Sequence, residues 1–179
     1  KASRMYLVAG DDPILEFGLR RAQGFDGALA ASRAAFIGGC SKTSNLLAGK
    51  LFGIPVSGTH SHSWVLSFDS EEEAFRSYSE VMPDNCILLV DTYDTIKGVK
   101  NAIRIAKELK KKGKKLIGIR IDSGDLAYLS NKARQLLDQE NLQEVQIFAS
   151  NALDEHVLTV LKKDVWNLHA ENTSRAIEK

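Results

Sequence analysis

The clearest indication of the fold is the segment Lys115-Leu116-Ile117-Gly118-Ile119-Arg120-Ile121-Asp122-Ser123-Gly124-Asp125. Its first seven residues are mostly apolar on both faces of an extended chain, which is typical of a strand inside a parallel sheet. A polar turn containing a glycine follows, and an amphipathic helical pattern then continues to about Glu140. A strand, a turn and a helix in this order predict one β/α unit.

The same unit occurs directly before and directly after this stretch. The unit before it has a strand at 86–90, a turn at 91–95 and a helix to about Lys112. The unit after it has a strand at 145–149, a turn at 150–152 and a helix at 153–163. Apolar strands that alternate with helices predict a parallel sheet, and right-handed crossovers would curl or wind it. The sequence therefore predicts an α/β fold.

The first half of the chain shows the alternation less regularly. The expected elements are helices at 15–22 and 28–35, a strand at 36–37, a capped helix at 46–52, a strand at 54–58 and a helical region at 62–81. With a last strand at Val165-Trp166, five or six β/α steps are visible. That number is too small to close a complete eight-fold barrel.

Both ends of the sequence look incomplete. Residues 1–4 have the character of the middle of a helix, and residues 167–179 are polar and lack a clear period. We expect the natural chain to begin earlier. We expect the last segment to be a terminus cut from a longer chain, or separate stretches of a longer sequence joined to each other.

Composition excludes several classes of partner. The chain has 179 residues, 24 of them Lys or Arg and 23 Asp or Glu. These charges nearly cancel, so no overall electrostatic field favours nucleic acid or an anionic membrane as a partner. The basic block at 110–115 has no interleaved aromatic residues, which favours a solvated helix end over a nucleic-acid patch. No apolar run is long enough to span a bilayer. Cys40 and Cys86 adjoin apolar runs, which favours buried thiols in a reducing, cytoplasmic compartment.

Polar side chains gather where the predicted strands end. They are His60, His62, Asp91, Asp94, Arg120, Asp122, Ser123, Asp125, Ser150 and Asn151. The carboxyl ends of parallel strands lie on one rim of a sheet, and barrel enzymes keep their active sites there. Asp, Ser and Asn at these positions are equally well explained as caps of the following helices.

The residue types on this rim suit an anionic ligand and a divalent cation. Asp91 and Asp94, with two further carboxylates after the next strand, suit Mg²⁺ better than zinc, for which no Cys/His spacing exists. The turn Ser123-Gly124 could hold a phosphate through its amides. His62 could be a general base, a phosphoryl acceptor or a hydrogen-bonded core histidine. His60 would share its face only if the strand continued that far.

Five motifs, in order and spacing, resemble those of nicotinate phosphoribosyltransferase. They are Leu15-Glu16-Phe17-Gly18-Leu19-Arg20-Arg21-Ala22-Gln23-Gly24, Ser44-Asn45-Leu46-Leu47-Ala48-Gly49, Gly58-Thr59-His60-Ser61-His62-Ser63, Asp91-Thr92-Tyr93 and Arg120-Ile121-Asp122-Ser123-Gly124-Asp125. The resemblance covers residues 1–163 and leaves 164–179 unaligned, where the family continues into a strand and a Gly-Thr phosphate loop.

The resemblance implies a reaction and an architecture. Nicotinate and phosphoribosyl pyrophosphate would give nicotinate mononucleotide and pyrophosphate, with Mg²⁺ as cofactor and ATP as a hydrolysed co-substrate, in the salvage route of NAD biosynthesis. The expected fold is a partial, irregular parallel β/α barrel of the type II phosphoribosyltransferase kind, with flanking domains missing. Members are cytoplasmic homodimers, and no nucleic acid or membrane partner is expected.

The resemblance also implies residue roles. His62 matches the histidine that ATP phosphorylates, and Thr59 and Arg120 match residues that bind nicotinate. Arg20 matches a residue on the substrate rim, and Phe17 stands where a relative stacks an aromatic ring on the pyridine. Asp122, Ser123 and Gly124 match positions that hold the ribose and phosphates. Asp91 and Asp94 match positions near Mg²⁺ and pyrophosphate. Asn45 stands where the nicotinamide enzyme has an acidic residue that would repel a carboxylate, which favours nicotinate as the substrate.

Alternatives stay open. The chain could belong to a relative that uses nicotinamide or quinolinate, or it could be a truncated binding domain without turnover. The roles of His60 and His62 could also be exchanged, because other members can have an apolar residue at the position of His60.

Overall fold

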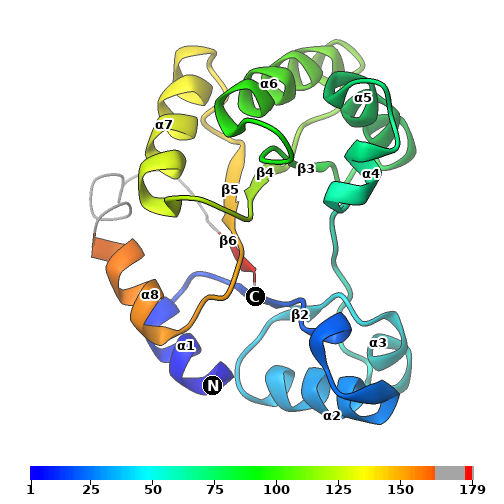
Figure 1. Cartoon of the computed structure of the whole chain (residues 1–179), viewed down its shortest axis with the longest axis vertical. Coiled ribbons are helices and arrows are strands. Elements are labelled where there is room, and N and C mark those ends of the chain that lie inside the picture. Colours follow the sequence, from blue (N-terminus) through cyan, green and yellow to red (C-terminus); the bar gives the residue numbers. More distant parts are fainter. Residues whose placement is uncertain (164–175, 179) are drawn as a thin grey trace. The chain divides into compact units, whose positions relative to one another are not determined.

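The computed structural model describes residues 1–163 and the backbone of residues 176–178. These residues form two compact units (Figure 1). One unit comprises residues 59–149, and the other comprises residues 1–58, 150–163 and 176–178. In the part of the chain that the structure describes, no helix is both long enough and apolar enough to cross a membrane.

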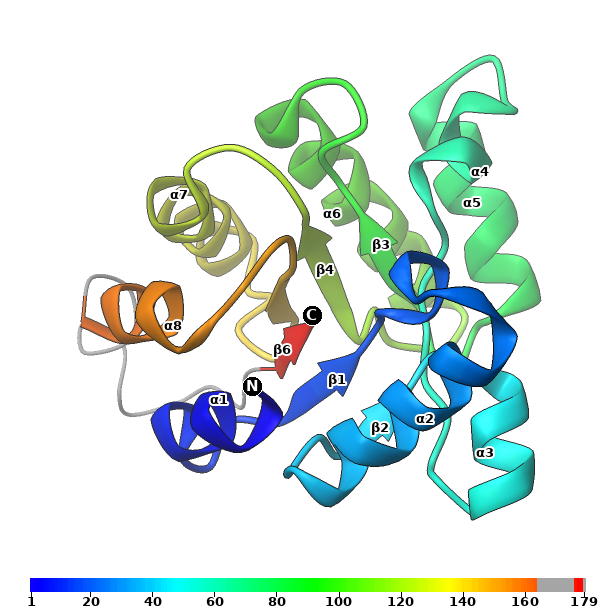
Figure 2. The same ribbon diagram turned by 60° about the horizontal axis from the view of Figure 1, so that its bottom comes forward.

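The unit of residues 59–149 is built on three parallel strands. They are β3 (Ile87–Leu89), β4 (Gly118–Ile121) and β5 (Gln146–Ala149), with β4 in the middle. The helices are α4 (His62–Leu66), α5 (Glu71–Val81), α6 (Thr95–Lys111) and α7 (Leu126–Gln139). Within this unit α6 and α7 lie side by side and pack on the strands (Figures 1 and 2). The predicted parallel β/α units are confirmed here.

Local chemistry explains where these helices begin. The side chain of Ser70 accepts a hydrogen bond from the Glu73 amide at the start of α5. Asp94 and Asp125 cap α6 and α7 in the same way. Such caps satisfy amide groups that have no partner inside the helix. Asp94 and Asp125 lie in the turns after β3 and β4, so the turns that carry rim residues also start α6 and α7.

Helix α6 approaches strand β3 through a glycine. A Cβ atom at Gly98 would lie 1.9 Å from the carbonyl oxygen of Val90, which is closer than any real contact. We expect Gly98→Ala to lower the free energy of unfolding by about 3 kcal/mol, because the helix must move away from a packed strand. Urea unfolding checks this, with Gly58→Ala as the control because a Cβ there would meet nothing within 4 Å. Equal midpoints for the two variants would contradict the close approach.

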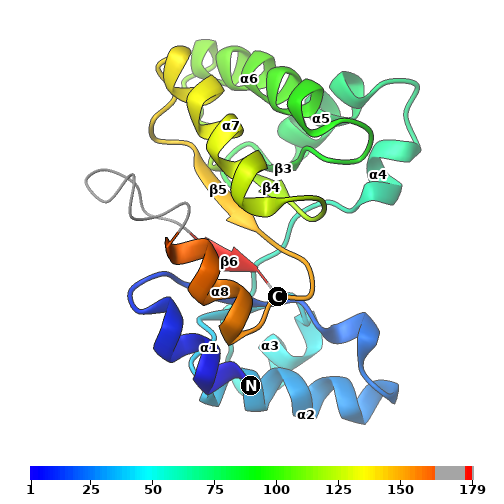
Figure 3. The same cartoon turned by 60° about the vertical axis from the view of Figure 1, so that its left-hand side comes forward.

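The other unit contains three short parallel strands. They are β1 (Ile14–Glu16), β2 (Lys42–Thr43) and β6 (Ala176–Glu178), with β1 in the middle. The helices are α1 (Ala2–Ala9), α2 (Gly24–Ile37), α3 (Leu46–Phe52), α8 (Glu155–Leu161) and a 3-10 turn, η1 (Leu19–Arg21). Figure 3 shows α1 beside α8 in this unit. The predicted helix at 46–52 is confirmed, with Asn45 as its cap and a left-handed Gly53 after it.

Three predictions for the first sixty residues are wrong. Residues 15–22 form β1 and η1 instead of a helix, because residues 14–16 are buried and pair with β2 and β6. Residues 36–37 end α2 and form no strand, and the glycines that follow end the helix. The predicted strand at 54–58 is reduced to an isolated bridge between Thr43 and Val56.

The established architecture is a mixed α/β fold with parallel strands. The predicted strand at Val165-Trp166 lies outside the described residues. The predicted separate segment at 164–179 also lies outside them, except that residues 176–178 form β6 and pair with β1.

Candidate active site

His62 lies at the first position of α4, directly after extended backbone at Ser61. Its Nδ1 atom is 3.1 Å from Oγ1 of Thr92, in the turn after β3. Its Nε2 atom is 3.5 Å from Oδ2 of Asp122, in the turn after β4. The side chain is 37% exposed. The imidazole is therefore held between two strand ends and remains open to a ligand.

Arg120 projects from β4 into the same group of side chains. Its Nη1 atom donates a hydrogen bond to Oγ1 of Thr59 over 2.8 Å, and its Nη2 atom is 3.5 Å from Oδ1 of Asp122. The guanidinium is buried, with 11% of the side chain exposed. The predicted meeting of His62, Arg120 and Asp122 is thus confirmed as geometry. Their chemical roles stay predictions.

Asp91 fixes the turn that carries Asp122 and Ser123. Its Oδ2 atom accepts hydrogen bonds from the Asp122 amide over 2.8 Å and from the Ser123 hydroxyl over 2.6 Å. Gly124 has a φ of 76°, a conformation that favours glycine, so this turn needs a glycine after Ser123. Asp91 therefore couples the ends of β3 and β4.

The two carboxylates predicted to bind metal differ in their surroundings. Oδ1 of Asp91 is buried and accepts no hydrogen bond from a described residue. Asp94 is exposed, and its Oδ1 atom caps α6 by accepting from the Lys97 amide over 2.8 Å. Burial is the main cause that raises the pKa of the Glu71 carboxyl, and the charges of Asp91 and Asp94 add to it. The Glu71 carboxyl is therefore more easily protonated than an exposed glutamate.

The carboxylates of Asp91 and Asp94 fit a magnesium ion that takes most of its ligands from groups other than protein side chains. The described residues contain no group of three or more His, Cys, Asp or Glu side chains arranged around a metal position. Mg²⁺ commonly binds through one or two carboxylates, with phosphate oxygens and water as the other ligands. The unpaired oxygen of Asp91 meets that requirement, whereas Asp94 is already committed to its helix.

His60 lies in the core, unlike His62. It is 6% exposed, and its ring packs against Phe75 and Tyr78 with centroids 5.8 and 4.8 Å apart. Its Nε2 atom accepts a hydrogen bond from the Leu89 amide over 3.1 Å. Burial lowers the pKa of His60 to about 4, so the imidazole is neutral near pH 7. The helix begins between the two histidines, and their side chains diverge as a result.

Three predicted site residues belong to the other unit. Asn45 is buried, and its amide nitrogen donates to Oγ of Ser32 over 3.1 Å and to the Ala28 carbonyl over 3.5 Å. Its Oδ1 atom accepts from the Ala48 amide. Arg20 is exposed within η1, and Phe17 is half-buried between β1 and η1. The side chain of Asn45 is thus already occupied inside its own unit.

Sequence reasoning missed two residues that organise these sites. Thr92 is the partner of the His62 ring, and a hydroxyl directly after an apolar strand was the available signal. Glu16 is 5% exposed, and its carboxylate accepts hydrogen bonds from the Thr43 hydroxyl and the Gly18 amide. It escaped notice because the stretch was interpreted as an exposed amphipathic helix.

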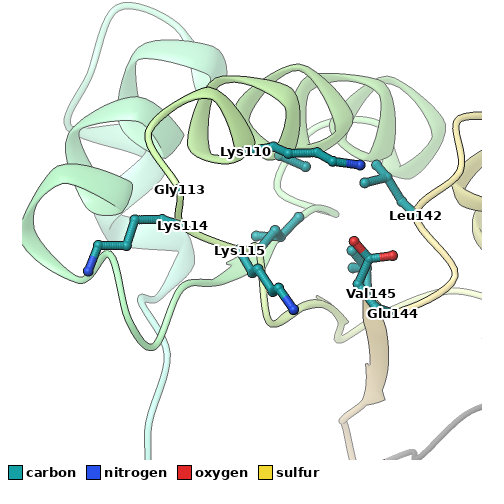
Figure 4. Close-up of a pocket in the computed structure, with 9 residues that line it drawn as sticks. Lys110, Gly113, Lys114, Lys115, Leu142, Glu144 and Val145 are labelled. Atoms are coloured by element: carbon teal, nitrogen blue, oxygen red, sulfur yellow. The ribbon is translucent and has the colours of Figure 1, made fainter.

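A pocket of about 180 Å³ lies at the opposite ends of β4 and β5 (Figure 4). It is lined by Ala106, Lys110, Gly113, Lys114, Lys115, Leu116, Leu142, Glu144 and Val145. Most of these residues precede the strands, whereas Asp122 follows one. Lys114 points away in Figure 4 and pairs with Asp84 over 2.7 Å. This pocket is therefore separate from the rim that holds His62.

Comparisons with known proteins agree with the motifs. No protein-family model matches the chain. Nicotinate phosphoribosyltransferase of Bacillus subtilis is 51% identical over 176 residues, which cover 94% of this chain and 35% of that protein. Nicotinate phosphoribosyltransferase pncB2 of Mycobacterium tuberculosis is 44% identical over 161 residues, covering 90% of this chain and 34% of its own length.

Solved structures show the same likeness. Human nicotinic acid phosphoribosyltransferase matches with a TM-score of 0.85 and 30% identity, over 99% of this chain and 45% of the human chain. Nicotinate-nucleotide pyrophosphorylase of Pyrococcus furiosus matches with a TM-score of 0.78 and 26% identity, over 99% of this chain and 44% of the other. The chain spans about a third of the length of the curated relatives it matches.

Proposed function

This chain belongs to the nicotinate phosphoribosyltransferase family, and we propose on that premise that the whole protein converts nicotinate and phosphoribosyl pyrophosphate to nicotinate mononucleotide and pyrophosphate, with hydrolysis of ATP. The observation that carries the proposal is the meeting of Thr59, His62, Arg120 and Asp122 around one rim. These side chains come from two segments, 59–62 and 120–122, and together they offer a cation, an imidazole and a carboxylate to one small ligand.

Arg120 is proposed to bind the carboxylate of nicotinate. A guanidinium presents paired N–H groups that match a planar carboxylate, and such charge-assisted bonds are stronger in a desolvated site. The bond to Thr59 and the proximity of Asp122 hold the guanidinium in place before the ligand arrives. Asn45 is neutral at the position where an acidic residue would disfavour a carboxylate ligand, and Phe17 and Arg20 keep their proposed roles in substrate binding.

His62 is proposed to accept the γ-phosphoryl group of ATP. A neutral imidazole with its proton on Nδ1 can donate to Oγ1 of Thr92, which leaves the lone pair of Nε2 for attack. In that step a bond forms between Nε2 and the γ-phosphorus, and the bond from that phosphorus to the bridging oxygen breaks, releasing ADP. The carboxylate of Asp122, near Nε2, can take the proton when the imidazole is charged.

The turn after β4 is proposed to hold the ribose and phosphates of phosphoribosyl pyrophosphate. Asp122, Ser123 and Gly124 supply a carboxylate, a hydroxyl and turn amides there. Asp91, with Asp94 as the second candidate, would hold Mg²⁺ through carboxylate oxygens. When bound, Mg²⁺ would stabilise the negative charge that grows on the departing pyrophosphate.

The larger architecture is part of the proposal. We infer that the parallel strands form a segment of an irregular β/α barrel, which in the whole protein carries flanking domains and works as a cytoplasmic homodimer. The extended match to the human structure supports the barrel segment. No nucleic acid or membrane takes part in this function.

An assay of the full-length protein with three bases tests the proposal. Pyrophosphate release from phosphoribosyl pyrophosphate and ATP is expected with nicotinate and at a far lower rate with nicotinamide or quinolinate. Faster release with either other base would identify a relative with that specificity. Calorimetric binding of phosphoribosyl pyrophosphate without release for any base would identify a binding domain without turnover.

A further inference from the structure

The proposed chemistry gives no task to the buried imidazole of His60, which is 6% exposed. It stands between Thr59, which contacts Arg120, and His62, which contacts Thr92 and Asp122. The segment 59–62 therefore carries two rim side chains, and His60 between them turns into the core. What holds this segment in place decides whether those two side chains reach the rim.

The imidazole of His60 satisfies an amide group at the edge of the sheet. β3 is an outer strand of its unit, paired with β4 on one side only. The Val90 amide donates to the Arg120 carbonyl over 3.1 Å, so the Leu89 amide points the other way along the alternating strand. There it donates to Nε2 of His60 over 3.1 Å. The imidazole thus acts where a neighbouring strand would otherwise supply a carbonyl.

The second ring nitrogen extends this link to the start of α4. Since Nε2 accepts from Leu89, the proton of the neutral ring is on Nδ1, which lies 3.4 Å from the Ser61 carbonyl. Ser61 is the residue before the helix, and His62 is its first residue. One ring therefore joins the edge of β3 to the segment that presents His62.

We propose that His60 is a positioning residue, which holds residues 59–62 against the edge of β3 so that Thr59 and His62 meet the rim. The inference rests on the proposed function for its catalytic readout. β3 continues directly into Asp91 and Thr92, so the same bond sets the distance between the His62 ring and its partner Thr92. Mere filling of the space beside Phe75 and Tyr78 would not require a hydrogen-bond acceptor.

Two substitutions of His60 separate positioning from packing. His60→Gln keeps an acceptor near the place of Nε2 but loses the ring, whereas His60→Phe keeps a ring among aromatic neighbours but has no acceptor. In the full-length protein, His60→Phe is expected to lower kcat and the rate of His62 labelling from γ-labelled ATP by roughly tenfold to a hundredfold. His60→Gln is expected to stay within about threefold of the wild type, because it can still accept from Leu89.

Hydrogen exchange at the Leu89 amide gives a readout that is independent of turnover. Protection of that amide is expected to persist in His60→Gln and to fall in His60→Phe. Phe75→Leu is the matched control, since it loosens the same aromatic cluster and leaves the acceptor intact, so its labelling rate and Leu89 protection are expected to be retained.

The opposite pattern overturns the inference. Normal labelling and normal Leu89 protection in His60→Phe would mean that His60 only fills space. Equal losses in both variants would mean that an acceptor for the Leu89 amide is not what holds the segment. A wild-type protein that takes up no label would instead contradict the proposed function, and the exchange data would still decide whether His60 holds the segment.

Discussion

Replacing His62 with alanine is expected to abolish acid-labile labelling of the full-length protein by γ-labelled ATP. Kcat for ATP-coupled turnover is expected to fall by roughly a hundredfold or more, since the variant loses a nucleophile that no neighbour replaces. Asp122 would remain in place because its amide donates to Asp91 and its carboxylate lies 3.5 Å from Arg120. Filter binding at alkaline pH and a steady-state pyrophosphate assay measure the two effects.

A control histidine makes the labelling result specific. His156 is exposed on α8 and follows the cap residue Asp154, far along the chain from the rim residues. His156→Ala is expected to take up label as the wild type does. Label that persists in His62→Ala would assign the phosphoryl acceptor to another residue, and His60→Phe, with its buried position filled, would then be the next variant to assay.

Replacing Arg120 with alanine is expected to raise KM for nicotinate by about tenfold to a hundredfold. That range corresponds to the loss of about 1.5–3 kcal/mol, typical of a hydrogen bond to a charged group. Arg120→Lys is expected to recover only part of the loss. An ammonium group keeps the charge, but it cannot contact Thr59 and a planar carboxylate with the geometry of a guanidinium.

The Arg120 experiment needs a control for charge and one for folding. Arg104 is an exposed arginine of α6 that pairs with Glu72, and Arg104→Ala is expected to leave KM for nicotinate unchanged. Urea unfolding shows whether Arg120→Ala is folded before kinetics are compared. A folded Arg120→Ala protein with an unchanged KM would place the nicotinate carboxylate elsewhere, with Arg20 as the remaining predicted arginine.

The elements that were predicted correctly are those with local causes. The apolar strands β3, β4 and β5 and their helices follow from periodicity and from caps a few residues away, as at Asp94 and Asp125. The cap at Asn45 and the left-handed Gly53 around α3 are local in the same sense. Because these causes lie within a few residues of each element, the local sequence is enough to predict the elements.

The elements that were missed depend on distant partners. Residues 14–16 form a strand because β2 and β6 lie on either side of them, and those partners are far along the chain. The buried carboxylate of Glu16 is likewise satisfied by the hydroxyl of Thr43, 27 residues away. Local spacing at 15–22 could not reveal either partner, so it favoured a helix.

What the sequence determined by itself is the set of chemical groups and the order of the β/α units that bring them to strand ends. The resemblance favoured His62 as the phosphoryl acceptor, but the sequence left an exchange of roles with His60 open. Only the tertiary structure distinguished them, because the edge amide of Leu89 and the aromatic cluster exist only after β3 and α5 have packed. Those contacts keep His60 neutral and buried, and the start of α4 leaves the ring of His62 accessible between Thr92 and Asp122.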